Sequence, residues 1–422
     1  MSALATGASS GGADIIAAQI DSLLQQRREA LRRAESDGTK VIGYFPGGFV
    51  PEELIYASGA IPLCLAAGGD ARVADEALSI VPSVICPFAR AQLGHMLLKT
   101  DPFYNAVDLL VVPSTCQHVK KIGDIWEYLE GPHVFKLGVP YEHDKDFELE
   151  YYRDRLRALK ERLESVTGNV ITNDKLREAV EVYNRLRRLL RTLGETRRGG
   201  HQADGPAAAI SSLDFARLNH ASFYADPAAM ATALEDICAA MSAVTGTGGS
   251  TGSSEARPRL LLMGPNLAAG DYDLFTLVAN AGGDIVVEDI FEGIRDYWQT
   301  VDVSGDQESG AQDPIEALAR AYLVDKRPAA FMRGSLPARL KFALDLIRDY
   351  TVSGVLWYQL ICCEFYDEEA YYFDMALRER GTPMLIVESD YHALDSGPSR
   401  TRLAAFVETL QGGPLGEGLV DA

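Results

Sequence analysis

The sequence predicts an α/β protein with two Rossmann-like parallel-sheet lobes and an intervening helical region. From residue 40 to about residue 140, short Val, Ile and Leu runs alternate with helical stretches. This β–turn–α–β order is typical of a parallel sheet. The same alternation returns after residue 258, beyond a stretch rich in Glu, Arg and Leu at helical spacing. We therefore expect two lobes of similar plan, as an ancient duplication would produce.

An N-terminal segment, residues 1–38, should contain one helix, because residues 14–33 place apolar side chains at helical spacing. The first lobe should follow at 39–146. A helix at 51–58 is expected there, with proline at its first position and acid in its first turn. The strands expected in this lobe lie at 40–45, 60–66, 77–86, 107–113 and 133–140.

A helical region is expected at 147–245, with two long helices that are broken near 167–169 and more helix at 211–241. Residues 246–258 read as a Gly/Ser linker and mark a domain boundary. The second lobe should occupy 259–422. Its expected strands are 259–265, 284–290, 353–363 and 382–391, with helices at 271–283, 340–350, 367–381 and 401–410.

Composition limits the partners of the chain. A formal charge of −20 over 422 residues argues against nucleic acid and against an anionic membrane surface. The N-terminus lacks the features of a signal peptide, and no run of about 18 apolar residues appears. Six cysteines are too few for a disulfide scaffold. These features indicate a reducing cytoplasm, where clustered thiols mean metal binding or catalysis more often than disulfides.

A cysteine stands at the C-terminal end of three of the predicted strands. Cys86, Cys116 and Cys363 (alternatively Cys362) stand beside turn residues, at the sheet edge where ligands bind. Each alone is as well explained as a small buried hydrophobe, and their spacing forms no local motif. Three convergent thiolates would suit zinc or an iron–sulfur cluster. A 4Fe–4S cluster held by three cysteines leaves one iron free for an external oxygen.

Other candidates near Cys116 are less specific. His118 could be an acid–base group facing the cleft or part of a solvated helix start. Lys120 and Lys121 could bind substrate, although a solvated helix start explains them better. The two remaining cysteines, Cys64 and Cys238, have apolar neighbours, and we expect both to pack in the core.

Several segments together resemble a known family. VIGYFPGGFVPEELIYASGAIPL, ICPFARAQLG, DLLVVPSTC, SGVLWYQLICCEFYDEE and GTPMLIVESDY resemble the 2-hydroxyacyl-CoA dehydratases, a family that includes the cluster-bearing subunits of ATP-dependent benzoyl-CoA reductase. The resemblance extends over about residues 40–150 and 259–410. It implies a 4Fe–4S cluster on Cys86, Cys116 and Cys363. Cys363 is favoured over Cys362 because an acidic residue, Glu364, follows it.

The resemblance also implies a reaction. A 2-hydroxyacyl-CoA dehydratase removes water from an acyl-CoA thioester through a ketyl radical. Its partners are a homologous sibling subunit and a separate ATP-dependent, cluster-bearing activator. The alternatives are a benzoyl-CoA reductase subunit and a non-catalytic cluster scaffold that relays electrons. Two departures from the family pattern leave the substrate open, namely Gln117 where many members have aspartate, and the doubled Cys362–Cys363.

Overall fold

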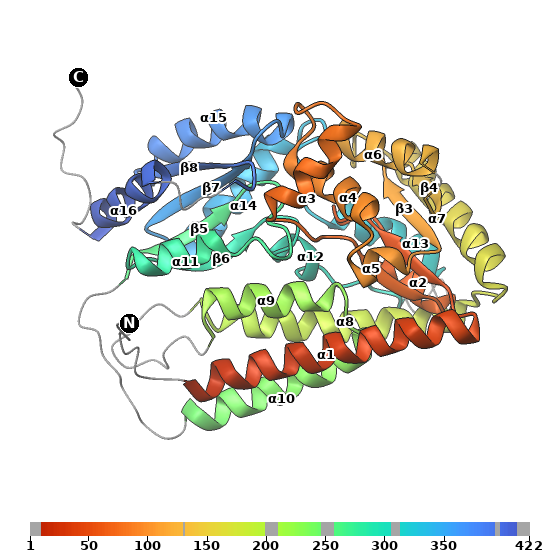
Figure 1. Cartoon of the computed structure of the whole chain (residues 1–422). Helices are drawn as coiled ribbons and strands as arrows, with labels where there is room; N and C mark the ends of the chain where they lie inside the picture. Colours follow the sequence, from red (N-terminus) through yellow and green to blue (C-terminus); the bar gives the residue numbers. More distant parts are fainter. Residues whose placement is uncertain are drawn as a thin grey trace.

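Two all-parallel sheets form the framework of the protein. A computed structural model describes residues 10–129, 131–198, 210–245, 257–304, 313–392 and 397–411. Each sheet has four strands, in the orders β2-β1-β3-β4 and β6-β5-β7-β8 (Figure 1). The predicted α/β class with two Rossmann-like lobes is confirmed. The two strand orders are the same, as expected for lobes of similar plan.

The strands of both sheets coincide with apolar runs of the sequence. They are β1 Val41–Tyr44, β2 Ile61–Cys64, β3 Leu109–Pro113, β4 His133–Leu137, β5 Arg259–Met263, β6 Asp284–Asp289, β7 Gly354–Leu360 and β8 Met384–Ser389. Every residue of β1, β3 and β7 is buried. Central strands of parallel sheets are covered on both faces by helices, so they read as continuous apolar runs.

Helices connect and cover the strands. In chain order they are α1 Ser10–Asp37, α2 Glu52–Ala57, α3 Ala71–Glu76, the 3₁₀ turn η1 Ala77–Ser79, α4 Pro87–Leu98, α5 Pro102–Asn105, α6 Gln117–Tyr128, α7 Asp146–Thr167, α8 Asn173–Glu195, α9 Ser212–Ser222, α10 Pro227–Thr245, α11 Asp273–Asn280, α12 Ile294–Tyr297, α13 Pro314–Arg320, the π-helix η2 Ala321–Asp325, α14 Ser335–Asp349, α15 Glu364–Arg378 and α16 Gly397–Gln411.

A layer of helices lies under both lobes. Figure 1 shows α1, α8, α9 and α10 packed side by side below the sheets. The expected break near 167–169 is confirmed, since α7 ends at Gly168 in the left-handed conformation with φ +74°. Glycine adopts this conformation without a Cβ penalty. Residues 246–256, most of the predicted linker, fall outside the described residues.

One predicted strand is wrong. Residues 77–86 form η1 and a series of turns instead of a strand. Pro82 removes a ladder donor in the middle of this run. Ile80 and Val84 are 42% and 59% exposed, whereas a strand of a covered parallel sheet would be buried. Cys86 therefore does not end a strand, and it precedes helix α4 directly.

The carboxyl edges of the two sheets meet. The loop after β2 pairs with the loop after β5: the Gly68 N–H donates to the Ala269 carbonyl at 3.0 Å, and the Ala269 N–H donates to the Ala66 carbonyl at 2.8 Å. In each sheet the strand order reverses between its two central strands, β1 and β3 or β5 and β7. Open α/β sheets bind ligands at this switch point, outside the carboxyl ends.

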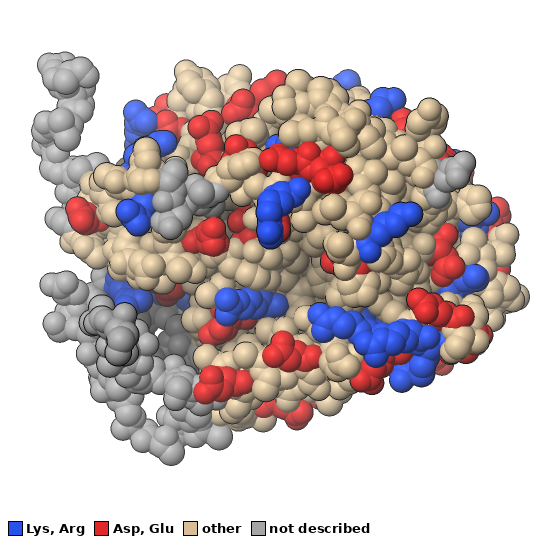
Figure 2. Space-filling view, viewed as in Figure 1, with Lys and Arg blue, Asp and Glu red and all other residues tan. Residues whose placement is uncertain are grey.

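The surface carries charges of both signs. On the face shown in Figure 2, Lys and Arg side chains are interspersed with Asp and Glu side chains. Among the described residues, no helix is long and apolar enough to cross a bilayer.

Candidate functional site

Three cysteines share one structural position. Cys86, Cys116 and Cys363 are the N-cap residues of α4, α6 and α15 respectively. The Cys116 sulfur accepts a hydrogen bond from the backbone N–H of Val119 at 3.4 Å. Backbone N–H groups of Ala89 and Tyr366, each also three positions into its helix, lower the pKa of the other two thiols. Three helix N-termini thus offer positive ends to sulfur.

The three thiols influence one another electrostatically. Burial raises the pKa of Cys86 to about 12, with a further contribution from the nearby Cys116. Burial likewise raises the pKa of Cys363 well above its usual value, with added repulsion from Cys86 and Cys116. Segments that lie 30 and 247 residues apart in the sequence therefore bring their sulfurs within electrostatic range. Uncharged thiols are favoured in such a site until a cation neutralises them.

His118 links two of these segments. Its Nδ1 accepts a hydrogen bond from the backbone N–H of Cys86 at 3.2 Å. Partial burial lowers the pKa of the imidazole, and the Glu364 carboxylate opposes this effect. Glu364 also raises the pKa of Cys116, so the starts of α6 and α15 adjoin. His118 thus contacts the Cys86 backbone, and the acid–base role suggested by the sequence stays a prediction.

The two lysines behind His118 differ in their surroundings. Lys121 is exposed and its Nζ pairs with the Asp124 carboxylate at 3.0 Å. Lys120 is half-buried, lowers the pKa of the Cys116 thiol, and makes no ion pair within the described part of the chain. Substrate binding by Lys120 and Lys121 stays a prediction, and Lys120 is the lysine whose ammonium is free to meet a ligand.

The donor set fits a cluster better than a single ion. Among the described residues, no three His, Cys, Asp or Glu side chains form a site for one metal ion. Three thiols that interact electrostatically without forming such a site would suit a 4Fe–4S cluster, in which each cysteine binds a different iron. A zinc site, the alternative, would need its ligands to be arranged tetrahedrally around a single ion.

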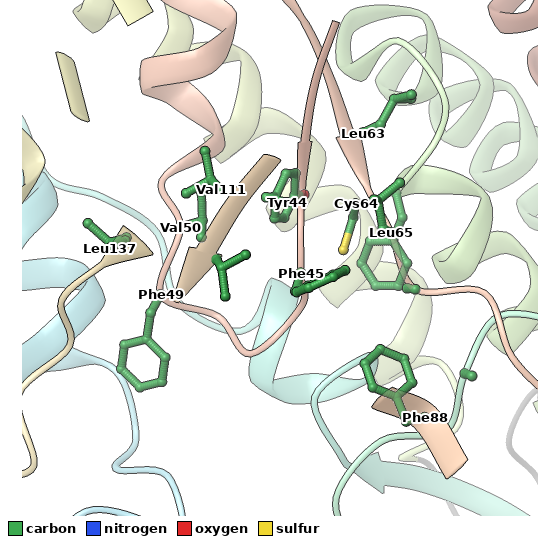
Figure 3. Packing of buried hydrophobic residues seen from close by; sticks show 14 of the residues in the cluster. Tyr44, Phe45, Phe49, Val50, Leu63, Cys64, Leu65, Phe88, Val111 and Leu137 are labelled. Carbon is green, nitrogen blue, oxygen red and sulfur yellow. The ribbon is translucent and has the colours of Figure 1, made fainter. Parts of the chain in front are cut away.

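The other two single cysteines are not N-cap residues, and Cys64 lines the cleft described below. Cys64 ends β2, is 2% exposed and packs in the core. Figure 3 shows its sulfur among Tyr44, Phe45 and Leu65. Cys238 is half-buried on α10 and packs against the second core cluster. The predicted core packing is confirmed for Cys64, and Cys238 packs at the margin of the core.

A cleft between the lobes is lined by Cys64 and by none of the three N-cap cysteines. Its cavity of about 20 Å³ has room for about one water molecule. Ionisable side chains from both lobes line it: Tyr44 and Glu52 from the first, Asp296 and Lys326 from the second. These four residues come from β1, α2, α12 and the segment after η2. No pattern in the sequence indicated that they would meet.

The electrostatics of the cleft favour proton exchange near neutral pH. Burial raises the pKa of Glu52 to about 8, and the Asp296 carboxylate adds to the shift. The Tyr44 hydroxyl donates a hydrogen bond to Glu52. Burial lowers the pKa of Lys326 to about 8, although Asp296 opposes the effect. A carboxyl group and an amine that both titrate near pH 8 are suited to acid–base work.

Glycines after β1 shape the cleft and join it to the thiols. A Cβ at Gly48 would collide with Lys326 Nζ, so the absence of a side chain lets the ammonium approach the loop. A Cβ at Gly47 would lie 3.7 Å from Thr115, the residue before Cys116. On the other side, the ring of Phe291 packs 6.0 Å from that of Tyr366, which follows Cys363 in α15. Two residues of the cleft wall, Gly47 and Phe291, thus lie beside Thr115 and Tyr366, which are one and three residues from Cys116 and Cys363.

A buried ion pair fixes the wall formed by α2. Arg187 of α8 donates to Glu53 at 2.7 Å and to the Tyr322 hydroxyl at 2.6 Å, and that hydroxyl donates to Glu53 at 2.8 Å. This Glu53–Arg187–Tyr322 triad joins α2, α8 and η2. It holds Glu52, the adjacent residue, at the cleft.

Comparisons with known proteins cover most of the chain. Residues 48–410 match the family described as 2-hydroxyglutaryl-CoA dehydratase, D-component. The chain is similar to the putative dehydratase subunit YjiM of Escherichia coli (26% identical over 364 residues, 86% of this chain and 89% of that protein). It is also similar to the (R)-phenyllactyl-CoA dehydratase beta subunit of Clostridium sporogenes (21% over 391 residues, 91% and 95%).

A local match is stronger in identity but shorter. One of the benzoyl-CoA reductase subunits of Thauera aromatica is 34% identical over 152 residues, which are 36% of this chain and 38% of that protein. The full-length matches and the family match cover most of the chain. This chain therefore belongs to the family described as 2-hydroxyglutaryl-CoA dehydratase, D-component.

Proposed function

We propose that this chain is the iron–sulfur subunit of a 2-hydroxyacyl-CoA dehydratase and removes water from an acyl-CoA thioester. One observation carries the proposal: three thiols from distant segments converge at helix N-termini, in a chain of this family. Cys86, Cys116 and Cys363 would hold the 4Fe–4S cluster. When bound, such a cluster supplies one-electron reduction and a Lewis-acidic iron.

The residues around the thiols would stabilise a bound anion. Thiolate-ligated clusters carry negative charge, and the N-termini of α4, α6 and α15 present backbone N–H groups to the three sulfurs. Hydrogen bonds to cluster sulfurs raise the reduction potential. His118 fixes the Cys86 backbone relative to the loop that carries Cys116. The chain itself thus prepares the site for an electron-accepting group.

Glu52 is the proton carrier of the proposed reaction. With a pKa of about 8 it is protonated at neutral pH, so it can give its proton to the departing hydroxyl group of the substrate. The resulting carboxylate can then accept the proton that leaves the β-carbon. The two transfers balance: the thioester loses one water, and Glu52 returns to its starting state. Tyr44 orients the carboxyl group through its hydrogen bond.

Partners follow from the family. The relatives carry the names of subunits or components, and we propose a homologous sibling subunit for this chain. A separate ATP-dependent, cluster-bearing activator would deliver the electron. Lys120, which is half-buried at the start of α6, would meet an anionic group of coenzyme A in this proposal. A cytoplasmic location suits a reduced, oxygen-sensitive centre.

A second candidate has one observation in its favour. The local identity of 34% to a benzoyl-CoA reductase subunit exceeds that to the dehydratase subunits over longer stretches. The chain would then serve the reduction of an aromatic acyl-CoA ring. An electron-relay role without substrate is a third candidate, since the cleft has room for about one water molecule.

The test is anaerobic purification with the sibling subunit. We expect iron and sulfide in the wild type and a loss of one cluster in the Cys86→Ser, Cys116→Ser and Cys363→Ser variants. Cys238→Ser, on α10, is the matched control and should retain the wild-type iron content. Activity with 2-hydroxyacyl-CoA thioesters supports the dehydratase, and ATP-coupled dienoyl-CoA formation from benzoyl-CoA supports the reductase. Wild-type protein without iron would refute both.

A further inference from the structure

Lys326 brings an ammonium group without an ion pair to the cleft between the lobes. Within the described ranges of the chain, its Nζ takes part in no hydrogen bond and no salt bridge. The centroid of the Tyr322 ring lies 5.4 Å from Nζ, and on another side a Cβ at Gly48 would collide with it. A ring and a glycine without a side chain thus hold the ammonium, and its hydrogens are available to a ligand of the cleft.

The cavity that Lys326 lines has the size of a water molecule. Its volume of about 20 Å³ has room for about one water and is too small for an acyl group. Tyr44, Glu52 and Asp296 line the same cavity, so a guest of this size would find hydrogen-bond donors and acceptors around it. The guest that fits best is a single oxygen atom with its hydrogens. A dehydration releases such a molecule.

We propose that this cavity receives the hydroxyl group that leaves the 2-hydroxyacyl thioester, and that the Lys326 ammonium binds the departing oxygen. The inference rests on the proposed function, because it requires a dehydration in which Glu52 gives the proton. The bond between the α-carbon and the hydroxyl oxygen breaks with its electron pair on oxygen. The Glu52 proton completes the water, and the proton lost from the β-carbon restores Glu52. The electron lent by the activator returns at the end, so the substrate undergoes no net redox change.

An ammonium is suited to this step because the oxygen gains charge only while its bond to carbon breaks. The hydroxyl group of the bound substrate is neutral, so Lys326 would stabilise the transition state more than the ground state. Burial lowers the pKa of Lys326 to about 8, so the amine stays largely protonated at pH 7. The apolar side chains of Val50, Phe223 and Phe291 also line the cavity. They lower the local polarity and strengthen the attraction.

The first test is a crystal structure of the enzyme with its sibling subunit, prepared under anoxia without substrate. We expect an ordered water within hydrogen-bond distance, about 2.7–3.2 Å, of Lys326 Nζ and of the Glu52 carboxyl group. Lys326→Met keeps most of the side-chain length but donates no hydrogen bond, and this water should be lost. A wild-type cavity without ordered water would overturn the proposal, whether or not the variant folds. A water that persists in Lys326→Met would overturn it as well.

The second test is steady-state dehydration by the cluster-loaded enzyme with its sibling subunit and activator, using the 2-hydroxyacyl-CoA thioester that the wild type dehydrates fastest. Lys326→Met should lower kcat about a hundredfold and leave KM nearly unchanged. Lys341→Met is the matched control, because Lys341 is 78% exposed and pairs with Asp345 on α14. It should retain the wild-type kcat. A raised KM with unchanged kcat in Lys326→Met would overturn the proposal, since the ammonium would then bind the intact substrate.

The outcomes separate this inference from the proposed function. Wild-type protein that dehydrates no thioester defeats the proposed function and the inference with it. Wild-type dehydration with an unchanged kcat in Lys326→Met defeats only the inference. Circular dichroism and iron content of Lys326→Met, compared with those of Lys341→Met, show that a lost kcat does not come from a lost fold.

Discussion

The buried Glu53–Arg187–Tyr322 triad permits a quantitative test of how the cleft is held. Arg187→Met removes a cation that is 7% exposed and leaves the carboxylate of Glu53, 0% exposed, without its partner. Two of the hydrogen bonds, at 2.7 and 2.6 Å, are lost with it. Removing one partner of a buried pair costs about 3–5 kcal/mol, because an uncompensated charge stays buried. We expect a loss of this size in the free energy of unfolding.

A matched control lies two residues away on the same helix. Arg185 forms an ion pair with Glu235 at 2.6 Å, but their side chains are 44% and 46% exposed. Exposed pairs contribute about 0–1 kcal/mol, so Arg185→Met should change stability little. Both variants would be compared by urea denaturation followed by circular dichroism. Adding Glu53→Gln to Arg187→Met should recover part of the loss, and equal effects of the two Arg→Met changes would refute the reasoning.

Two further predictions concern the cleft. The pKa of Glu52 is raised to about 8 in the folded protein, so the folded state binds a proton more tightly than the unfolded chain, and stability should fall as the pH rises from about 4.5 to 8. Glu52→Gln should flatten this dependence in urea titrations at pH 5.5 and 7.5, and an unchanged slope would contradict the assigned pKa. Gly48→Ala should cost about 1–3 kcal/mol of backbone strain at φ +75° and also displace Lys326. Gly168→Ala, at φ +74° with open space around it, should cost only the strain, so equal losses of activity would argue against a role for Lys326.

The strands could be predicted where both faces of a strand are buried, because such a strand appears in the sequence as a continuous run of apolar residues. The run before Cys116 became β3, fully buried and ended by Pro113. The run before Cys86 has similar composition, but Ile80 and Val84 face outward and no strand forms. Periodicity alone cannot separate an apolar turn segment from a short buried strand. The strand that was expected to place Cys86 beside the other thiols is therefore absent, and Cys86 instead begins helix α4.

The cleft was not predictable from the sequence. Glu52 reads as an ordinary acidic residue in the first turn of a helix, where the helix dipole already explains it. Its pKa is raised by burial between the lobes and further by Asp296, a residue of the other lobe. Lys326 follows a π-helix that no sequence pattern indicated. These side chains meet only because the carboxyl edges of the two sheets face each other, which is a tertiary contact.

The equivalent strands of the two lobes end in the same way, and this explains which cysteines belong to the site. Cys116 lies three residues after β3 ends, and Cys363 lies three residues after β7 ends. The neighbouring central strand of each sheet is followed by a glycine of nearly the same conformation, Gly47 at φ +140° and Gly264 at φ +145°. Each switch point thus pairs a thiol with a turn that accommodates no side chain. Cys64 also stands at the end of a strand, but β2 is an edge strand, and its thiol packs in the core beside the cleft and caps no helix. Position in the sheet order, rather than proximity to a strand end alone, separates these sulfurs.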